Sequence, residues 1–267
     1  MIDWFQAIVL ALLQGLTEFL PISSSAHLVI PSLILDWPDQ GLAFDVAVHV
    51  GTLLAVLWYY RSDLAVMARE WRHSLTGGGV TDNSNLVWYL ALGTIPAGLF
   101  GFFGRHFIES ELRSLPVIAT TTLLFGLLLG WSDRTKGSLT QKRSLTAGLM
   151  LLIGCAQAIA LVPGVSRSGA TITAGLFLGL GRQQSARISF LLSIPVIFSA
   201  GVLKSWDLYW GAVPVDWLIL IIGAIISGLT AYLCIAVFIR LLDKIGMAPF
   251  VYYRIMLAAL LYAIWVF

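Results

Sequence analysis

The sequence predicts an all-α polytopic membrane protein, with six transmembrane helices and two re-entrant helix–loop–helix hairpins in an inverted repeat. Three observations predict this fold class. First, 58% of the 267 residues are hydrophobic and only 11% are charged, whereas soluble domains carry about 25% charged residues. Second, six apolar runs approach the roughly 20 residues that a helix needs to cross hydrocarbon. Third, two further apolar runs are interrupted at their centres by proline and serine.

The six predicted spans lie at 42–60, 86–104, 116–131, 187–204, 217–239 and 249–267. The connections at 61–85 and 205–216 are predicted to be loops. With these spans, residues 1–267 make a single membrane domain that leaves little chain for a soluble module.

The two interrupted runs are predicted to form hairpins. The first, 4–35, is broken at Pro21 and a serine run, and the second, 146–180, is broken at Pro163-Gly164 and another serine run. Each half is too short to cross a bilayer. Irregular backbone at membrane depth is tolerated only where protein or a polar cavity surrounds it. We therefore expect each run to enter and leave on the same face.

Counting crossings predicts the inverted repeat. Each half of the chain contains one hairpin and three spans, and an odd number of crossings turns the second half upside down. The first repeat is then 1–131 and the second 146–267. Sliding the chain by 143 residues aligns Gln14 with Gln157, Ser23 with Ser166 and Ser25 with Ser168, and sliding it by 130 aligns five positions of 90–99 with 220–229. Such similarity is weak support by itself.

Basic residues predict the orientation. One side of the membrane receives eleven of them, namely Arg61, Arg69, Arg72, Arg134, Lys136, Lys142, Arg143, Arg182, Arg187, Arg240 and Lys244. The other side receives three, Arg105, Arg113 and Lys204. The positive-inside rule places the larger set in the cytoplasm. Both termini then lie outside, and the hairpins enter from opposite faces.

The interrupted runs also carry the residues with chemical potential. Glu18, His27 and Arg167 are ionisable groups at predicted membrane depth. Insertion scales put the penalty for Arg- and Asp-like groups there at about 2.5–3.5 kcal/mol each. Because intramembrane charges of this kind usually mark functional sites, we expect these three groups to have partners and a role.

The residue types around them suit a phosphate group. Arg167 offers a planar fork of donors to phosphate oxygens. A serine-rich turn before a new helix offers backbone N–H groups and the positive end of the helix dipole. Gly164 and Gly169 allow the backbone to approach a ligand closely. Further hydroxyl donors come from Ser23, Ser24, Ser166 and Ser168.

Two residues could take part in the reaction itself. His27 is suited to act as a general base or to hold a nucleophilic serine. Glu18 could bind a divalent cation that bridges diphosphate oxygens, or accept a proton. Gln14 is four residues before Glu18, so the two can share one helix face.

Structural interpretations stand beside these functional ones. Serine and proline often mark an ordinary loop. Arg167 and Glu18 could form a purely structural ion pair, and His27 could be a buried histidine with satisfied hydrogen bonds.

Three further polar residues in predicted spans leave alternatives open. Asp45 and His49 are spaced i, i+4 on one helix face, so they either line the same cavity or pair with each other. Arg254 either snorkels to the membrane surface or contacts a headgroup.

The two interrupted segments resemble the undecaprenyl-diphosphate phosphatase family of the bacitracin-resistance type. One family motif, acidic or Gln, Gly-x-Thr-Glu-Phe-Leu-Pro-x-Ser-Ser and then His, matches Gln14–His27. The other, Pro-Gly-x-Ser-Arg-Ser-Gly with a following Thr, matches Pro163–Thr171. The resemblance extends to the length, the hydropathy profile and the ending at Pro249–Arg254.

The resemblance implies hydrolysis of undecaprenyl diphosphate to undecaprenyl phosphate and phosphate. This recycles the lipid carrier of cell-wall synthesis and confers bacitracin resistance. It also implies a divalent cation, Mg or Ca. Matched by motif, the catalytic set is Glu18, Ser24, His27 and Arg167. Substrate binding falls to Gln14, Ser23, Ser166, Ser168 and Thr171.

One position departs from the family pattern. Many members have glutamate where this chain has Gln14. The amide oxygen can still ligate a cation but brings no charge, so a mechanism that needs two carboxylates on the metal is not expected. We predict that Glu18 and Gln14 hold the cation.

The expected partners are a polyprenyl diphosphate lipid, membrane lipids and a possible second copy of the chain as a homodimer. A net charge of +2 without a clustered basic face predicts no nucleic-acid partner. The resemblance implies the bacterial inner membrane, with the site opening to the periplasm. The alternative function is a transporter or flippase for a polyprenyl phosphate lipid, because inverted repeats with broken helices are typical of transporters. Two chemical routes stay open, attack by Ser24 activated by His27 and direct attack by water.

Overall fold

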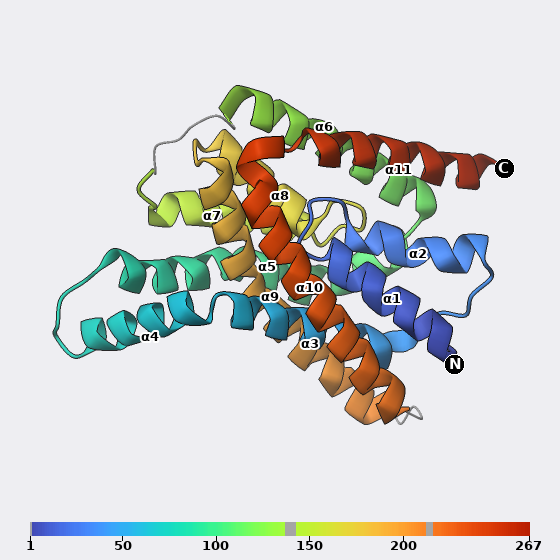
Figure 1. Cartoon of the computed structure of the whole chain (residues 1–267), viewed down its shortest axis with the longest axis horizontal. Coiled ribbons are helices and arrows are strands. Elements are labelled where there is room, and N and C mark those ends of the chain that lie inside the picture. The colour runs from blue at the N-terminus through green and yellow to red at the C-terminus, as the bar shows by residue number, and fades with distance from the viewer. Residues whose placement is uncertain (1, 137–142, 212–215) are drawn as a thin grey trace.

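The computed structural model describes residues 2–136, 143–211 and 216–267. Within these parts the chain forms eleven α-helices (Figure 1). They are α1 Trp4–Thr17, α2 Ser24–Ile34, α3 Gly41–Tyr59, α4 Arg61–Leu75, α5 Asp82–Glu111, α6 Leu115–Lys136, α7 Ala147–Ile159, α8 Arg167–Phe177, α9 Arg182–Gly211, α10 Trp217–Ile245 and α11 Ala248–Val266.

The predicted membrane spans are confirmed. By length and composition, six helices of the described chain can cross a membrane: α3, α5, α6, α9, α10 and α11. The two interrupted runs form the helix pairs α1–α2 and α7–α8, each joined by an irregular loop. These pairs are consistent with re-entrant hairpins, because each of their helices is too short to span.

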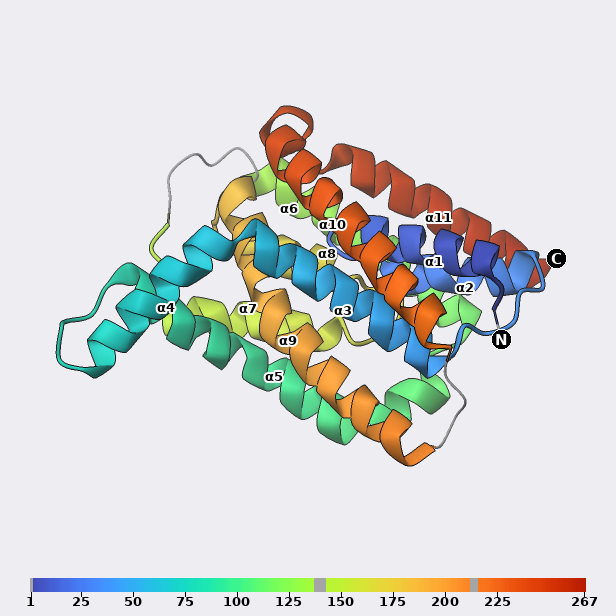
Figure 2. The same ribbon diagram turned by 60° about the horizontal axis from the view of Figure 1, so that its bottom comes forward.

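The hairpins pack across the two halves of the chain. Helix α1 lies along α10, and α7 lies along α5, while α6 pairs with α11 (Figures 1 and 2). Both termini lie at one end of the molecule, and the turn between α4 and α5 lies at the other. This reciprocal packing is what an inverted repeat would produce, and the repeat bounds 1–131 and 146–267 stay a prediction.

Glycines allow the backbones of these helices to touch. A Cβ atom added at Gly51 of α3 would lie 2.1 Å from the carbonyl oxygen of Ala224 in α10. One added at Gly154 of α7 would lie 2.3 Å from the carbonyl oxygen of Gly93 in α5. Small residues permit such close packing where helices lack a hydrophobic driving force for association. The contact at Gly154 brings the second hairpin directly against α5.

Two predicted loops are wrong. Most of 61–85 is helical, because the polar helix α4 buries Met67 and stacks Trp71 edge-on against Trp88 of α5. A helix that is polar over most of its surface carries no span signal, so hydropathy alone misses it. Helix α9 also continues into 205–216. The helices are longer than the apolar segments from which the spans were predicted, because their polar ends are helical too. The predicted cytoplasmic Lys142 lies outside the described residues.

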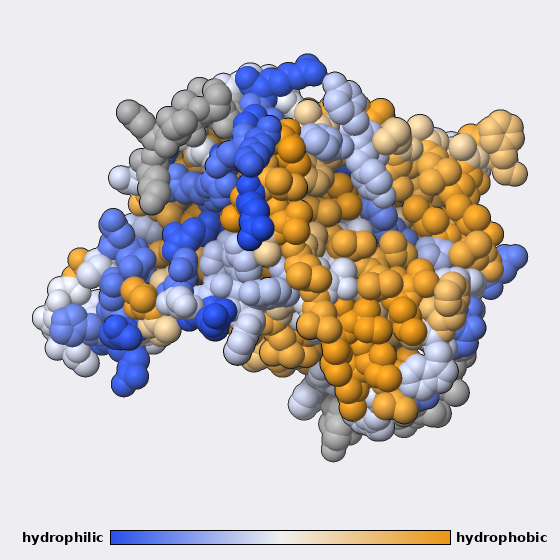
Figure 3. Space-filling view, viewed as in Figure 1, coloured by the Kyte–Doolittle hydropathy of each residue, from blue (hydrophilic) through white to orange (hydrophobic). Residues whose placement is uncertain are grey.

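The surface separates into apolar and polar regions. On the face seen in Figure 3, hydrophobic residues cover most of the right half, and hydrophilic residues gather toward the end where α4 lies. Large apolar side chains such as Ile225, Leu229 and Leu233 of α10 are more than half exposed. Such a surface fits contact with lipid tails, since soluble monomers rarely expose apolar patches of this size.

Candidate active site

The two hairpin tips share an unusual backbone turn. Ser23 precedes α2 with φ 74°, and Ser166 precedes α8 with φ 71°. A non-glycine residue in this region is strained, and such strain gathers at functional sites. Each serine hydroxyl accepts a hydrogen bond from a backbone N–H in the first turn of its helix, Ala26 at 3.4 Å and Gly169 at 3.1 Å. Both tips therefore turn abruptly into a capped helix N-terminus.

The tips contact each other directly. The backbone N–H of Gly164 in the second tip donates to Ser25 Oγ in the first, at 3.1 Å. In return, Ser168 Oγ donates to the carbonyl oxygen of Leu20, at 2.9 Å. The two interrupted runs therefore meet tip to tip, as predicted, and a ligand pocket between them stays a prediction.

Glu18 lies at the centre of this junction and is 8% exposed. Its Oε1 accepts from Arg167 Nη2 at 2.9 Å. Its Oε2 accepts from Gln14 Nε2 at 2.8 Å and from Ser24 Oγ at 3.5 Å. The Glu18 carboxylate is thus contacted by three other predicted site residues from two distant segments, Gln14, Ser24 and Arg167.

Arg167 has two further contacts that fix its direction. Its Nη1 donates to the carbonyl oxygen of Ser189 in α9 at 3.2 Å, and its guanidinium carbon lies 5.6 Å from the ring centroid of Phe19. Thr171 supports the same helix from behind, since its hydroxyl donates to the Arg167 carbonyl and to Ser189 Oγ. Thr171 is almost fully buried, and its hydrogen bonds connect α8 to α9.

The remaining predicted phosphate ligands are occupied within the tips. The Ser23 and Ser166 hydroxyls cap their helices, and Ser166 Oγ also lies 3.3 Å from Ser168 Oγ. Their direct contact with phosphate stays a prediction.

His49 joins the site from α3. Its Nε2 lies 3.8 Å from Glu18 Oε2, and its Nδ1 donates to the Asp45 backbone carbonyl at 2.7 Å. The Asp45 carboxylate instead accepts from Gln40. Of the two alternatives for this pair, His49 lines the site, and the two side chains do not bond each other.

His27 has partners that the sequence did not indicate. Its Nδ1 bonds the Ser23 carbonyl at 2.7 Å, and its Nε2 bonds the Tyr253 hydroxyl at 2.6 Å. Because a carbonyl oxygen only accepts, Nδ1 carries a proton, and in the neutral ring Nε2 accepts from the Tyr253 hydroxyl. The predicted contact between His27 and Ser24 is therefore not formed among the described residues.

Arg254 braces both tips from behind and neither snorkels nor reaches a headgroup. It is fully buried. Its guanidinium donates to the carbonyls of five residues, which are Pro21 in the first tip, Gly164 and Val165 in the second, and Thr121 and Thr122 in α6. The sequence indicated this contact with both tips only by placing an arginine in an apolar span.

The divalent cation at this site stays a prediction, and the buried oxygens can be compared with what a cation needs. No group of three or more His, Cys, Asp and Glu side chains in the described chain could hold a metal ion alone. Gln14 Oε1, however, is buried and accepts no hydrogen bond. Mg²⁺ often binds through one or two protein oxygens together with phosphate oxygens and water. Gln14 and Glu18 can provide that protein share.

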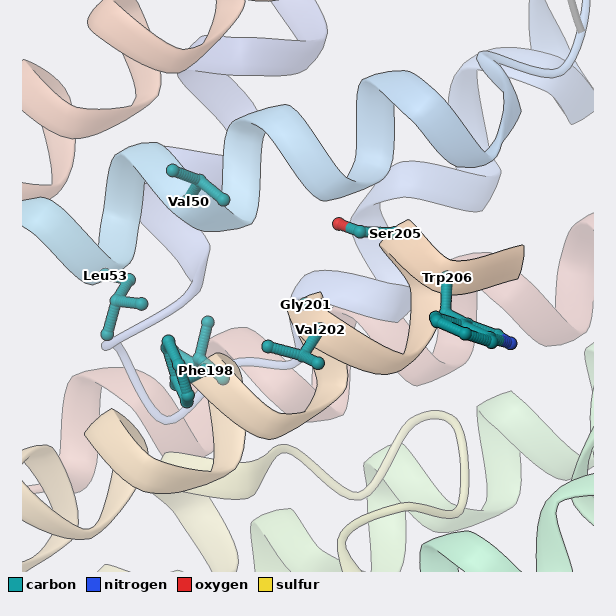
Figure 4. A pocket seen from close by; sticks show the side chains of 8 residues that line it. Val50, Leu53, Phe198, Gly201, Val202, Ser205 and Trp206 are labelled. Carbon is teal, nitrogen blue, oxygen red and sulfur yellow. The ribbon is translucent and has the colours of Figure 1, made fainter. Parts of the chain in front are cut away.

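An apolar cavity of about 520 Å³ lies between α3 and α9. Val50 and Leu53 line it from α3, and Phe198, Gly201 and Trp206 line it from α9 (Figure 4). Its lining suits a hydrocarbon chain.

The fold and the site define an integral membrane protein that holds two helix N-termini, an arginine and a carboxylate together among its spans. The chain belongs to the family described as bacitracin resistance protein BacA, which it matches over residues 7–260.

Relatives support this membership. An undecaprenyl-diphosphatase of Alcanivorax borkumensis is 58% identical over 260 residues, covering 97% of this chain and 98% of the relative. An undecaprenyl-diphosphatase of Teredinibacter turnerae is 54% identical over 260 residues, with the same coverage. One of Colwellia psychrerythraea is 55% identical, covering 94% of this chain and 95% of the relative.

Proposed function

We propose that this protein hydrolyses undecaprenyl diphosphate to undecaprenyl phosphate and phosphate, and so recycles the lipid carrier of cell-wall synthesis. The observation that carries the proposal is the junction at Glu18, where Arg167 and Ser24 meet from opposite hairpins. An anion can be held there by donors from both tips. Bacitracin resistance follows when the enzyme is abundant, as is typical of the family.

Arg167 neutralises charge on the transferring phosphoryl group. Its guanidinium is fixed by Glu18 and the Ser189 carbonyl, so little reorganisation is needed when substrate binds. The N-termini of α2 and α8 add oriented backbone N–H groups and two dipole ends. Catalysis of phosphoryl transfer rests almost entirely on such positioning and charge stabilisation.

A divalent cation, Mg or Ca, held by Glu18 and Gln14 would supply positive charge to the diphosphate oxygens. Glu18 also orients Arg167 and lies against Ser24, so its carboxylate sets the spacing between the anion clamp and the nearest hydroxyl.

Two routes of attack are compatible with these positions. In one, Ser24 Oγ bonds to the terminal phosphorus, undecaprenyl phosphate leaves, and water then cleaves the phosphoserine. In the other, water attacks directly with His27 as the base. Rapid acid quenching with substrate labelled in the terminal phosphate distinguishes them. Label on Ser24 supports the first route, and protein without label supports the second.

We also infer a bacterial inner-membrane location with the site opening to the periplasm. The support is the excess of basic residues predicted on one side, at the end of the molecule where α4 lies, opposite to both termini. Membrane-impermeant thiol reagents applied to intact cells test this. A cysteine introduced at the exposed C-terminal Phe267 should react, and one introduced at the exposed Arg69 of α4 should react only after lysis. Homodimer formation stays a prediction.

The decisive assay for the function is phosphate release from a C55 diphosphate by purified protein in detergent, where no membrane gradient exists. Release that depends on Arg167 supports the enzyme. Tight binding of the lipid without phosphate release would instead support the transporter or flippase alternative.

A further inference from the structure

We propose that Tyr253 is a positioning residue that fixes the orientation of the His27 imidazole, which its role as a base requires. The proposal rests on that proposed role of His27. The observation behind it is the 2.6 Å hydrogen bond between the Tyr253 hydroxyl and His27 Nε2. Neither the motifs nor the family resemblance assigns Tyr253 a role.

The geometry of the pair is well defined. The two rings are almost parallel and stacked, with an interplanar angle of 3° and centroids 5.5 Å apart. On the other side of the imidazole, Nδ1 bonds the Ser23 carbonyl. That bond keeps the proton on Nδ1 and leaves Nε2 as the one nitrogen able to accept a proton. The Tyr253 hydroxyl donates to this nitrogen and fixes the orientation of the ring in the resting site. The hydroxyl then releases Nε2 when that nitrogen accepts a proton from water or Ser24.

The position of Tyr253 is set by its neighbour in the chain. Arg254 follows it and bonds the carbonyls of Pro21 and Gly164, one in each tip. These bonds hold the α11 backbone against both hairpins. Tyr253 is 39% exposed, so its hydroxyl is not held by tight packing around the ring. The hydrogen bond to His27 therefore connects this ring to α11, the helix whose Arg254 bonds both hairpin tips.

A purely structural bond between α2 and α11 is the competing explanation. The two helices already contribute to one apolar cluster, α2 through Ala26 and α11 through Leu257 and Leu261. If the Tyr253 hydroxyl only adds to that contact, its loss lowers stability and leaves turnover unchanged. If it orients the base, its loss lowers turnover and leaves substrate binding unchanged.

The test uses Tyr253→Phe, with Tyr252→Phe as the matched control. Tyr252 is the adjacent tyrosine and is 60% exposed. We expect Tyr253→Phe to lower kcat by about tenfold or more with KM unchanged, since a positioned base contributes about 10²–10⁴ in rate. Tyr252→Phe should match the wild type. Wild-type kcat in Tyr253→Phe would overturn the proposal.

A double-mutant cycle separates positioning from structure. Combined with His27→Gln, the Tyr253→Phe change should have no further effect on kcat, because both act through one imidazole. Additive losses would overturn the proposal. Nitrogen-15 NMR of labelled histidine in detergent should also show a shifted Nε2 resonance of His27 in Tyr253→Phe, because the hydroxyl that donates to Nε2 is lost, and an unchanged signal would contradict the proposal.

The same variants distinguish a wrong role for His27 from a wrong role for Tyr253. If His27→Gln retains full activity, the proposed role of His27 is wrong. If His27→Gln is inactive and Tyr253→Phe is fully active, the role of His27 stands and only the role of Tyr253 is wrong.

Discussion

Ser24 and Arg167 occupy the same place on two different helices, and each contacts one oxygen of the Glu18 carboxylate. Each is the first residue of its helix and follows a capping serine with positive φ. The two positions are 143 residues apart, which is the offset that aligns the two motifs. The same backbone turn therefore occurs in both hairpins. In the first it presents the Ser24 hydroxyl to Glu18, and in the second it presents the Arg167 guanidinium.

Arg167→Ala should nearly abolish turnover, with a loss in kcat of at least about 10²–10³-fold, because it removes a preorganised donor for the phosphoryl group. The measurement is phosphate release in detergent, with circular dichroism to show that the protein still folds. Arg187→Ala is the control. Its ion pair with Asp63 is about 40% exposed on both sides, so its loss should leave activity intact. Near-normal turnover in Arg167→Ala would remove the anion-clamp role.

Gln14→Glu should lower the cation concentration needed for half-maximal activity, because it adds a second carboxylate beside Glu18. Gln14→Leu should raise that concentration, since it removes the unpartnered buried oxygen. Activity is measured against added Mg²⁺ or Ca²⁺ after treatment with a chelator. Gln157→Leu, at the aligned position on α7, should leave the cation dependence as it is. A shift in Gln157→Leu equal to that in Gln14→Leu would argue against a cation at Gln14.

Gly154→Ala should destabilise the protein by about 1–3 kcal/mol, because its methyl group would press on the Gly93 carbonyl and force α5 and α7 apart. Thermal unfolding in detergent measures the loss. Gly148→Ala on the same helix is the control, since a Cβ there meets nothing within 4 Å. Equal stability of the two variants would contradict the close packing of these helices.

Gly201→Trp should fill the apolar cavity between α3 and α9. A Cβ at Gly201 meets nothing within 4 Å, so the cavity can accept a side chain without disturbing the fold. If the cavity holds part of the prenyl tail, KM should rise for a C55 diphosphate and stay unchanged for a C15 diphosphate. Gly98→Trp, at an equally open position on α5, is the control. An equal rise for both substrates would indicate a general disturbance and not a tail site.

Hydropathy and helix breakers predicted the six spans and the two interrupted runs, because both act over a few residues. The same reasoning missed α4. That helix is stabilised by Met67 and Trp71 against α5, and its polar composition resembles that of a loop. Tertiary packing of one face, and not local hydrophobicity, made the helix.

Within the candidate site, the motif residues were predictable and their pairings were only partly so. A pairing of Glu18 with Arg167 was one of the alternatives, because ionisable groups at membrane depth need partners. His27 was expected to activate Ser24. Instead, α2 directs the His27 ring toward Tyr253, and Ser24 toward Glu18.

The sequence alone determined a helical, lipid-exposed chain with two polar interruptions, since composition and proline placement are local properties. Only the tertiary structure decided which groups those interruptions would meet. The bond between His27 and Tyr253 joins positions 226 residues apart, and that between Arg254 and Pro21 joins positions 233 residues apart. Such contacts depend on how α11 packs against both hairpins, and no pattern within a single segment encodes that packing.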